Sequence, residues 1–423
     1  MGGSLRDLLA DRPVHDWDLA TSALPEQTRS LFPGSVYENE FGTVDVDSGG
    51  DGIGIVQVTT FRADHDYADF RRPHRVEFGE SIERDLARRD FTVNAIAWGV
   101  EPGGAPRLVD PYGGRDDLAT GVLRAVGDAP TRFREDALRM VRAVRLAAAL
   151  ELTIEPDTLA AIGREAELVR HLSGERIAQE LTRILETPRP SVALRLLEDS
   201  GLLAVLWPDL AAQRGVPQNK IVGEDLWDHT LRSVDAASTP RIRLAALLHD
   251  LGKPATMADG RFVGHEIVGA DLARRFLDDL RWPHAERDRI VRLIRQHMFG
   301  YVPTWSDAAV RRFIAKVGRD LLEDLFLLRE ADNVGSGRPP EPDGLAELRR
   351  RVEAQLSAGV ALDRRGLAVD GADLIRELGL PPGPLIGRIL DRLLERAIAD
   401  PADNTRERLL RVARSIAAQG PTA

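Results

Sequence analysis

The sequence predicts an α+β protein, in which a small N-terminal α/β head is followed by a long, all-helical body. Residues 41–62 alternate β-branched and polar side chains around a cluster of glycine, aspartate and serine, a pattern typical of a β-hairpin. Strand-like patterns end near Asp110. From Thr131 onward, apolar residues recur at three- and four-residue steps almost to the C-terminus, which indicates successive amphipathic helices.

The chain is long enough for several domains. Its 423 residues allow roughly two to four domains of about 150 residues each. Proline- and glycine-rich breaks lie at residues 188–190, 217–219 and 334–344. Together with the change from strands to helices, they predict the segments 1–130, 131–220, 221–340 and 341–423.

The composition excludes several classes of protein. With 43% hydrophobic and 29% charged residues, the chain has no apolar run long enough to span a membrane. It has no cysteine, so disulfides and thiolate metal sites are excluded and any metal must be held by His, Asp or Glu. No signal-peptide pattern follows Met1, so we expect a cytoplasmic protein. The formal charge of −10 argues against a surface that coats nucleic acid along its whole length.

Two aspartates near the N-terminus form the first candidate site. Asp16 and Asp18 flank one tryptophan, so on an extended strand both carboxylates point to the same side. Such a pair suits Mg²⁺, usually with substrate phosphates as further ligands, although a solvated turn is the alternative. Gly2 and Gly3 precede a predicted helix, where backbone amides can bind phosphate oxygens. A phosphate cradle and a metal-binding acid pair are together the parts that nucleotidyl transfer requires.

Further charged motifs follow along the chain. The stretch LARRDFTVNAIAW contains Arg88, Arg89, Asp90 and Asn94 ahead of an apolar segment. In FREDALRMVRAVR, an aspartate and an arginine three residues apart are neighbours on one face of a predicted helix. A pair with this spacing is usually a surface salt bridge, so it indicates function only in combination with the other motifs.

Six motifs occur in a family-specific order. GGSLRD, HDWDLAT, RRDFTVNA, DPYGGRDDL, EDALR and GERIAQEL have the order and spacing of the bacterial tRNA nucleotidyltransferase and poly(A) polymerase family. More narrowly, they resemble the CCA-adding enzymes of the second class. The resemblance covers residues 1–185 and continues more weakly to the end. It implies Mg²⁺-dependent addition of the 3′-terminal CCA to tRNA from CTP and ATP, without a nucleic-acid template.

The resemblance also implies roles for individual residues. Asp16 and Asp18 correspond to the catalytic Mg²⁺ ligands, and either is a candidate base for the proton of the attacking hydroxyl. The residues expected to bind the nucleotide are Gly2, Gly3, Arg6, Arg88, Arg89, Asp90, Asn94, Asp136, Arg139 and Arg142.

The base-reading residues among them have a specific chemistry. The Asp136 carboxylate accepts and the Arg139 guanidinium donates, so together they can pair with the edge of either cytosine or adenine. Glu175, Arg176 and Glu180 match a motif that is expected to brace the base-reading helix.

Two features depart from the family pattern. Gln57 stands where relatives usually have a third carboxylate, which would lower the charge that holds the metal. Relatives also carry a short strand before the two glycines, so we expect either that the start codon is assigned too late or that the strand is absent. Residues 61–80 resemble the mobile loop that CCA-adding enzymes keep. This loop favours full CCA addition, while addition of CC alone or A alone stays open.

A second constellation lies in the helical body. Within residues 241–254, His249 and Asp250 lie at the end of a predicted apolar helix, and with His229 and Asp332 they resemble the HD-type metal phosphohydrolases. Imidazoles and carboxylates suit a divalent transition metal, and two further histidines, His265 and His297, could bind a second one. The expected chemistry is hydrolysis of a phosphomonoester or a cyclic phosphodiester at an RNA end.

Other readings of the chain remain open. The HD-type site could carry the main activity, with a relic transferase head, or the whole chain could be a non-catalytic RNA-binding scaffold. Near the C-terminus, Gly383, Gly387 and Arg388 could contact an RNA backbone or could simply serve helix packing. The expected partners are tRNA, CTP and ATP, with no membrane contact, and the sequence does not indicate an oligomeric state.

Overall fold

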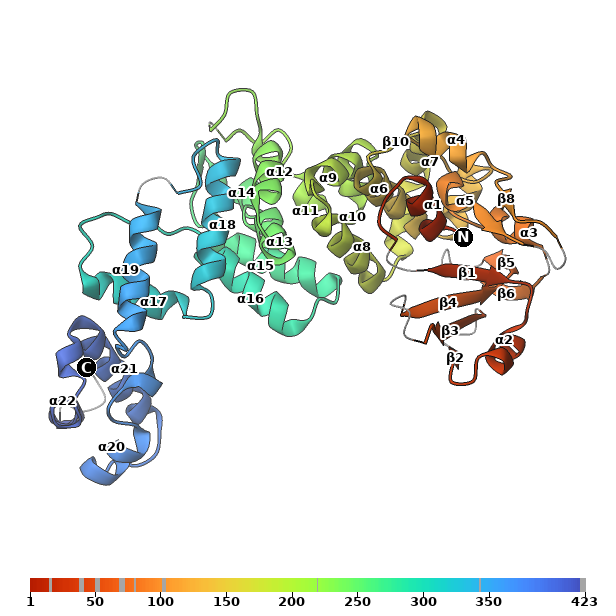
Figure 1. The fold of residues 1–423 in the computed structure, drawn as a ribbon. Coiled ribbons are helices and arrows are strands. Elements are labelled where there is room, and N and C mark those ends of the chain that lie inside the picture. The colour runs from red at the N-terminus through yellow and green to blue at the C-terminus, as the bar shows by residue number, and fades with distance from the viewer. Residues whose placement is uncertain are drawn as a thin grey trace. The chain divides into compact units, whose positions relative to one another are not determined.

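The computed structural model describes most of the chain. The described residues are 1–14, 17–37, 42–49, 54–67, 73–79, 81–100, 104–218, 220–341 and 344–418. Asp16 therefore lies outside the described residues. The chain forms two compact units, of which unit 1 is Met1–Val216 with Arg275–His284, and unit 2 is Pro217–Arg274 with Ala285–Ala423. The predicted α+β class is confirmed, with strands concentrated in the head and helices elsewhere (Figure 1).

Unit 1 contains the head and the helical neck that follows it. Its strands are β1 (Asp18–Thr21), β2 (Val36–Tyr37), β3 (Thr43–Asp47), β4 (Ile55–Thr60), β5 (Arg62–Tyr67), β6 (Pro73–Phe78), β7 (Ala97–Gly99), β8 (Arg107–Val109), β9 (Val122–Leu123) and β10 (Thr153–Ile154). Its helices are α1 (Gly3–Leu9), α2 (Pro25–Leu31), α3 (Ile82–Ala87), η1 (Thr92–Asn94), α4 (Gly114–Thr120), α5 (Ala129–Glu135), α6 (Leu138–Leu150), α7 (Pro156–Glu165), η2 (Ala166–His171), α8 (Gly174–Glu186), α9 (Pro190–Asp199), α10 (Leu202–Leu206) and α11 (Pro208–Ala211).

Unit 2 is almost entirely helical. Its elements are α12 (Leu226–Ala236), α13 (Pro240–Leu248), α14 (Lys253–Thr256), β11 (Met257–Ala258), β12 (Arg261–Phe262), α15 (His265–Asp279), α16 (His284–Gln296), α17 (Asp307–Val317), α18 (Leu322–Gly335), α19 (Leu345–Ser357), η3 (Arg364–Gly366), α20 (Gly371–Leu378), α21 (Pro384–Ala399), η4 (Pro401–Asp403) and α22 (Arg406–Ala418). The end of α15 and the start of α16 belong to unit 1. Among the described residues, no helix has both the length and the apolar character needed to cross a bilayer.

The predicted hairpin is the centre of the head sheet. The strand order is β1-β4-β3-β2, with β1 parallel to β4 and β3 antiparallel to it (Figure 1). Val44 and Val46 of β3 are buried, so Asp45 between them points to the opposite face of the sheet. One face of the sheet thus packs into the head, and the other carries the polar residues that matter below.

Two details of the strand prediction were wrong. Strands continue past Asp110, since the two-residue strands β9 and β10 pair in parallel beyond it, and β11 and β12 pair in unit 2. Strands this short contain no alternation that a sequence pattern could reveal. The segment 61–80 includes an antiparallel pair, β5 and β6, rather than only a loop, while residues 68–72 and 80 lie outside the described part.

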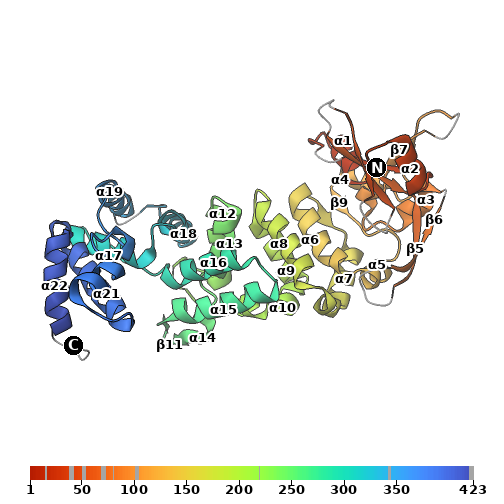
Figure 2. The ribbon, with the colours of Figure 1, turned by 90° about the horizontal axis from the view of Figure 1, so that it is seen from below.

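The helical neck of unit 1 is built around α6. This helix packs against α8 and α9, which lie beside it in Figure 2. Met140, Val141 and Val144 on α6 are fully buried, and so are Leu181 and Ile184 on α8. Burial of these large apolar side chains fixes the position of α6, which carries several of the candidate nucleotide-binding residues.

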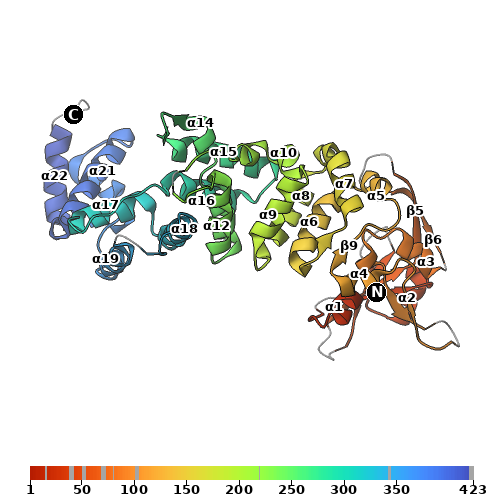
Figure 3. The same ribbon diagram turned by 90° about the horizontal axis from the view of Figure 1, so that it is seen from above.

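In unit 2, a buried arginine joins three helices of the C-terminal part. Arg311 on α17 is only 7% exposed, and its guanidinium donates to the carbonyls of Ile398 at 2.6 Å and Ala399 at 3.0 Å. It also donates to Gln355 Oε1 on α19 at 2.9 Å. The positive charge therefore caps the C-terminal end of α21, which lies beside α17 in Figure 3, and satisfies carbonyls that have no partner inside the helix.

We predict that Arg311→Met destabilises unit 2 by about 2–4 kcal/mol, because it leaves the helix carbonyls without their charged donor. Urea unfolding followed by circular dichroism measures this loss. The matched control is Arg312→Met, which removes the exposed arginine next to it. Equal stability of both variants would contradict the capping role.

Candidate functional site

A row of polar side chains crosses the head sheet. Asp18 of β1 pairs in register with Gln57 of β4, which pairs with Asp45 of β3. Residues paired across neighbouring strands point to the same face, here the face opposite the buried Val44. The Gln57 amide nitrogen donates to Asp45 Oδ1 at 3.3 Å. The described part of the candidate metal site is thus an acid–amide–acid row, and Asp16 is not among the described residues.

Asp45 was not predicted as a site residue. The signal was available, since TVDVD and IVQVTT are the two strands of the predicted hairpin. Their pairing brings Asp45 opposite Gln57, but the register of a hairpin with a long connection cannot be read from the sequence alone.

The N-terminal glycines have different roles. Gly2 has a φ of 66°, a left-handed conformation that favours glycine, and a Cβ atom there would lie 3.0 Å from the Arg89 guanidinium. Its amide is not directed at a ligand, because it donates to the Ile96 carbonyl at 3.0 Å. Gly2 therefore provides the turn, and Gly3 is the first residue of α1.

Arginines of the RRD motif share one buried carboxylate. Arg88 and Arg89 contact opposite oxygens of Asp85, at 2.7 Å and 3.2 Å. Burial opposes ionisation of Asp85, but the two guanidinium groups outweigh it and lower the pKa of this carboxyl. Arg6 reaches the same region, where it donates to Asn94 Oδ1 at 2.7 Å. The predicted phosphate-binding residues are therefore brought together, and Asp85, which was not predicted, holds two of them.

Asp90 is already fully engaged by the protein. Its Oδ2 accepts from Nε of Arg142 at 2.9 Å and from Nη2 of the same guanidinium at 2.7 Å. Its Oδ1 accepts from the Asn94 side chain and from the Phe91 backbone amide. Burial would raise the pKa of Asp90, but Arg142 and Asn94 hold it far below its usual value. The buried Asp90 and the partly exposed Arg142 thus connect the head to α6.

The predicted base-reading pair lies at a break between helices. We predicted one continuous helix through FREDALRMVRAVR, but Asp136 is extended, with φ −147°, between α5 and α6. Its Oδ1 accepts from the Leu138 amide at 3.1 Å and so caps the new helix. Its Oδ2 accepts from Arg176 at 2.7 Å. The prediction was wrong because a side-chain cap of this kind leaves the apolar periodicity intact.

Arg139 is held in the first turn of α6. Its guanidinium donates to Glu135 Oε2 at 2.7 Å and to the backbone carbonyls of Arg132 and Arg88. The side chain is 11% exposed. Arg139 therefore points back toward the RRD motif, with its planar fork fixed by three acceptors.

Helix α8 supports this region, as expected for the GERIAQEL motif. Arg176 holds Asp136, and the buried Glu180 accepts from Arg145 at 2.5 Å and lies 4.0 Å from Arg142. The contact of Arg176 joins α8 to the residue that caps the start of α6, and the contacts of Glu180 join α8 to one face of α6. Glu175 differs, because it forms an exposed pair with Arg281.

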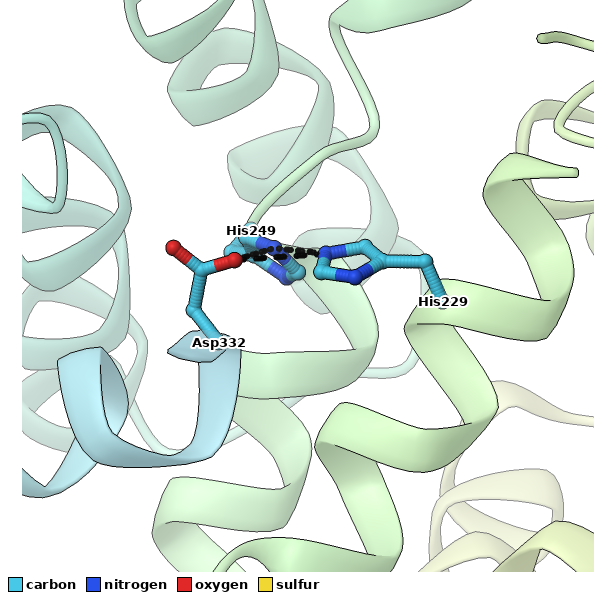
Figure 4. Close-up of side chains that lie close together, drawn as sticks. All are labelled: His229, His249 and Asp332. Atoms are coloured by element: carbon cyan, nitrogen blue, oxygen red, sulfur yellow. Dashed lines mark hydrogen bonds and ion pairs between the residues drawn. The ribbon is translucent and has the colours of Figure 1, made fainter. Parts of the chain in front are cut away.

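The second constellation converges in unit 2. His229 on α12 and His249 at the end of α13 place their Nε2 atoms 3.2 Å apart, as Figure 4 shows. Asp332 on α18 brings Oδ1 within 3.3 Å of His229 Nε2 and 3.8 Å of His249 Nε2. These three side chains have the spacing of metal ligands.

Asp250 contacts His229 and His249 with one carboxylate oxygen and faces two further histidines with the other. Its Oδ2 lies 3.3 Å from His229 Nε2 and 3.1 Å from His249 Nε2. Its Oδ1 lies 3.4 Å from His265 Nε2 and 3.8 Å from His297 Nε2, and these two imidazole nitrogens are 3.3 Å apart. The structure therefore brings together all six residues named for this site in two groups of three, and Asp250, which belongs to the second group, also contacts the two histidines of the first.

Hydrogen bonds on the outer side of the rings fix the tautomers. The Nδ1 atoms of His249, His265 and His297 each lie 2.7 Å from a backbone carbonyl three residues earlier. A carbonyl only accepts, so Nδ1 carries the proton and the lone pair of Nε2 faces the centre. Burial and the nearby His249 lower the pKa of His297 to about 3, which keeps it neutral. Converging neutral nitrogens and buried carboxylates fit a divalent metal.

Two lysines that the sequence analysis did not single out also face this centre. Lys253 Nζ lies 2.6 Å from Asp250 Oδ2, and Lys220 Nζ lies 3.5 Å from Asp332 Oδ1. Lys253 is three residues after Asp250, so its position could have been inferred from helical spacing. Lys220 precedes α12 in a loop, and no sequence pattern places it.

Three family models match the chain in succession. Residues 1–124 match the poly A polymerase head domain, residues 151–214 match the probable RNA and SrmB-binding site of polymerase A, and residues 227–336 match the HD domain.

Curated relatives cover nearly the whole chain. A CCA-adding enzyme of Geobacillus stearothermophilus is 34% identical over 411 residues, covering 97% of this chain and 90% of the relative. That of Geobacillus kaustophilus is 36% identical over 420 residues, with the same coverage. That of Streptococcus sanguinis is 33% identical over 421 residues, covering 95% of this chain and 88% of the relative.

Solved structures agree with this relationship. The crystal structure of a Bacillus stearothermophilus CCA-adding enzyme in complex with CTP aligns with a TM-score of 0.71 and 32% identity, over 99% of this chain and 94% of that one. A Thermotoga maritima CCA-adding enzyme complexed with tRNA shares the fold, with a TM-score of 0.57 and 19% identity over 98% of this chain and 90% of that one. The chain belongs to the family of CCA-adding enzymes.

Proposed function

We propose that the protein adds C, C and A to the 3′ end of tRNA from CTP and ATP, without a nucleic-acid template. The observation that carries this function is the identity of about one third to CCA-adding enzymes over 97% of the chain. The nucleotide-binding motifs lie within the matched residues, and the structure gathers those that it describes around α1, η1 and α6. Because the substrate is tRNA, we place the protein in the cytoplasm.

In the proposed reaction, Asp18 and Asp16 hold Mg²⁺. The metal would lower the pKa of the attacking 3′ hydroxyl and stabilise the leaving pyrophosphate. Arg6, Arg88 and Arg89 bind the triphosphate, and their positions are fixed by Asn94 and Asp85. The described carboxylate Asp18 suits a hard cation, which supports Mg²⁺ as the metal.

For base selection, we propose that Asp136 and Arg139 pair with the incoming base. The carboxylate offers acceptors and the guanidinium offers donors, which matches both cytosine and adenine. Both side chains already have protein partners in Arg176 and Glu135, so these partners determine where the reading atoms lie. At the other end of the chain, Gly383 precedes α21, and we propose that Gly383, Gly387 and Arg388 contact the tRNA backbone.

We predict that Asp18→Asn lowers CMP incorporation into tRNA lacking its CCA end by about 100-fold or more, because a neutral amide holds Mg²⁺ poorly. Incorporation of labelled CTP and ATP in the presence of Mg²⁺ measures this. The control is Asp47→Asn on β3, an exposed aspartate whose carboxylate accepts from the Gly49 amide.

Omitting ATP or CTP in turn separates full CCA addition from addition of CC alone or A alone. If Asp18→Asn kept activity within about twofold of wild type, the proposed metal role would be wrong, and absence of incorporation by wild type would favour a relic head or a scaffold.

We predict that Arg176→Met reduces discrimination against GTP and UTP by about tenfold, because Asp136 loses the donor that fixes its Oδ2. The ratio of kcat/KM for correct and incorrect nucleotides measures this change. Arg170→Met, which removes an exposed pair with Glu167, is the control. A variant that lost activity equally for all four nucleotides would indicate a purely structural role for Arg176.

A second function is favoured by the histidine cluster. We propose that His229, His249, Asp250 and Asp332, with His265 and His297, hold one or two divalent transition metals and that the site hydrolyses a phosphate ester at an RNA end. The metal would convert a bound water into a hydroxide nucleophile. The fixed tautomers of three histidines support this proposal.

We predict that Asp250→Asn weakens metal binding in unit 2 by about 100-fold, since this carboxylate faces both groups of imidazoles. Metal content after dialysis and phosphate release from 3′-phosphate and 2′,3′-cyclic RNA ends measure the effect. CCA addition is expected to persist, because the head is unchanged. The control is His284→Ala, an exposed histidine at the start of α16, and equal metal content in both variants would contradict the site.

A further inference from the structure

We propose that Lys220 binds the phosphoryl group of the HD-site substrate and makes this site prefer a terminal phosphomonoester, a dianion, over a phosphodiester. The inference rests on the proposed hydrolase function and adds a substrate-binding residue to it. Lys220 lies outside the HD domain match, which covers residues 227–336.

The loop that carries Lys220 is fastened at both ends. A β-bridge joins Pro217 to Asp225, and Asp225 caps α12 by accepting from the Asp228 amide at 3.0 Å. Within the loop, Gln218 Oε1 accepts from Lys253 Nζ at 3.3 Å. The loop is thus joined both to the start of α12 and to Lys253, and these contacts hold Lys220 next to the ligands.

Lys220 lies between the ligands and solvent. Its Nζ is 3.5 Å from Asp332 Oδ1 and 3.5 Å from His229 Nε2. Its side chain is 29% exposed, whereas those of His229 and Asp250 are at most 2% exposed. An ammonium in this position can meet a substrate that approaches the ligands from solvent.

The centre has more cations than carboxylates. Among the described residues that contact it, Asp250 and Asp332 face Lys220, Lys253 and Arg329, which lies 3.7 Å from Asp332. This leaves an excess of one positive charge before any metal is counted, and each divalent metal adds two more. A largely buried site with this charge stabilises an anion, and a dianion more than a monoanion.

A third acid, Glu266, offsets this excess when it is counted, so the net positive charge of the loaded centre comes from the metal. The Glu266 carboxylate lies 3.7 Å from His265 Nδ1, which is the ring nitrogen that bonds to the Phe262 carbonyl and faces away from the other ligands. Its charge is therefore on the outer side of the ring.

The three cations differ in their partners. Arg329 donates to the carbonyls of His297 at 2.7 Å and Phe299 at 2.6 Å, so its guanidinium serves the backbone. Lys253 contacts Asp250 and Gln218. Lys220 contacts Asp332 Oδ1 and His229 Nε2, atoms that a metal would bind, and its side chain is 29% exposed against 8% for Lys253. A metal at these atoms competes with the ammonium and directs it to the oxygens of a bound phosphate.

The choice of lysine supports a ligand-binding role. The chain contains only three lysines among its 57 basic residues, namely Lys220, Lys253 and Lys316, and two of them face this centre. Arginine is the usual cation of this protein for fixed contacts with carboxylates and carbonyls. A lysine has a compact charge on a flexible stem, which suits a contact that must adjust to substrate.

In the proposed hydrolysis, the oxygen of water forms a new P–O bond as the ester P–O bond breaks, and the leaving alcohol takes one proton of the water. Lys220 donates hydrogen bonds to the non-bridging oxygens and transfers no proton. A monoester presents more negative charge on these oxygens than a diester does, so removal of the ammonium should reduce binding of the monoester most.

The experiment compares full-length wild type with Lys220→Met, Lys220→Arg and the control Lys316→Met, an exposed lysine on α17. After loading with Mn²⁺, three quantities are measured: Mn²⁺ content, calorimetric binding of inorganic phosphate, and kcat/KM for p-nitrophenyl phosphate and bis(p-nitrophenyl) phosphate. We expect Lys220→Met to lower phosphate affinity and monoester kcat/KM by about tenfold, with at most about a twofold change for the diester. Mn²⁺ content should not change, and Lys220→Arg should lie between Lys220→Met and wild type.

Each other result overturns the inference. Equal losses for monoester and diester, or a loss of Mn²⁺, would mean that Lys220 only supports Asp332. Hydrolysis by wild type with no effect of Lys220→Met would reject the role of Lys220 and leave the hydrolase function intact. If wild type bound no Mn²⁺, the hydrolase proposal would fail and this inference with it.

Discussion

The ion pair between the buried Asp90 and the partly exposed Arg142 is the interaction on which the candidate nucleotide-binding region depends. Asp90 belongs to the RRD motif of the head, and Arg142 lies on α6, so the pair joins the segment proposed to bind phosphate to the helix proposed to read the base. Removing one partner would leave a buried charge without compensation, which costs more than the pair contributes to stability. Asn94 links the same carboxylate to Arg6, and Glu180 lies 4.0 Å from the same arginine. One set of charges therefore connects the residues proposed for phosphate binding with the helix proposed for base selection.

The two candidate sites use different side chains, in keeping with the different tasks proposed for them. In the candidate nucleotide site, the guanidinium of Arg139 is held by fixed acceptors, Glu135 and the Arg88 carbonyl, and such a rigid fork suits recognition of a planar base. In unit 2, imidazoles with a defined tautomer converge on a small volume, which suits a metal. The absence of cysteine from the chain is consistent with this division, since histidine and carboxylate are the only strong metal ligands available.

The sequence was sufficient for the class of fold, the head hairpin and the convergence of the HD-type residues, because these follow from periodicity and from ordered motifs. It was insufficient where the outcome depends on one side chain or on distant pairing. The break at Asp136 follows from a side-chain cap within an apolar pattern that continues past it. Asp45 and Lys220 reach their sites through strand register and loop closure, neither of which leaves a local signal. The role of Asp16 stays a prediction, since it lies outside the described residues.

Gln57 shows how a neighbouring strand can determine the orientation of an amide side chain. A carboxylate can only accept a hydrogen bond, so Asp45 requires the amide nitrogen of Gln57 to face it. The amide oxygen then points away from β3, and Asp18 is the residue paired with Gln57 on the other side. Gln57 can therefore present an oxygen toward Asp18, but without a negative charge. In the proposed metal site, the Asp45 carboxylate would supply its charge from one strand further away, through space rather than as a ligand.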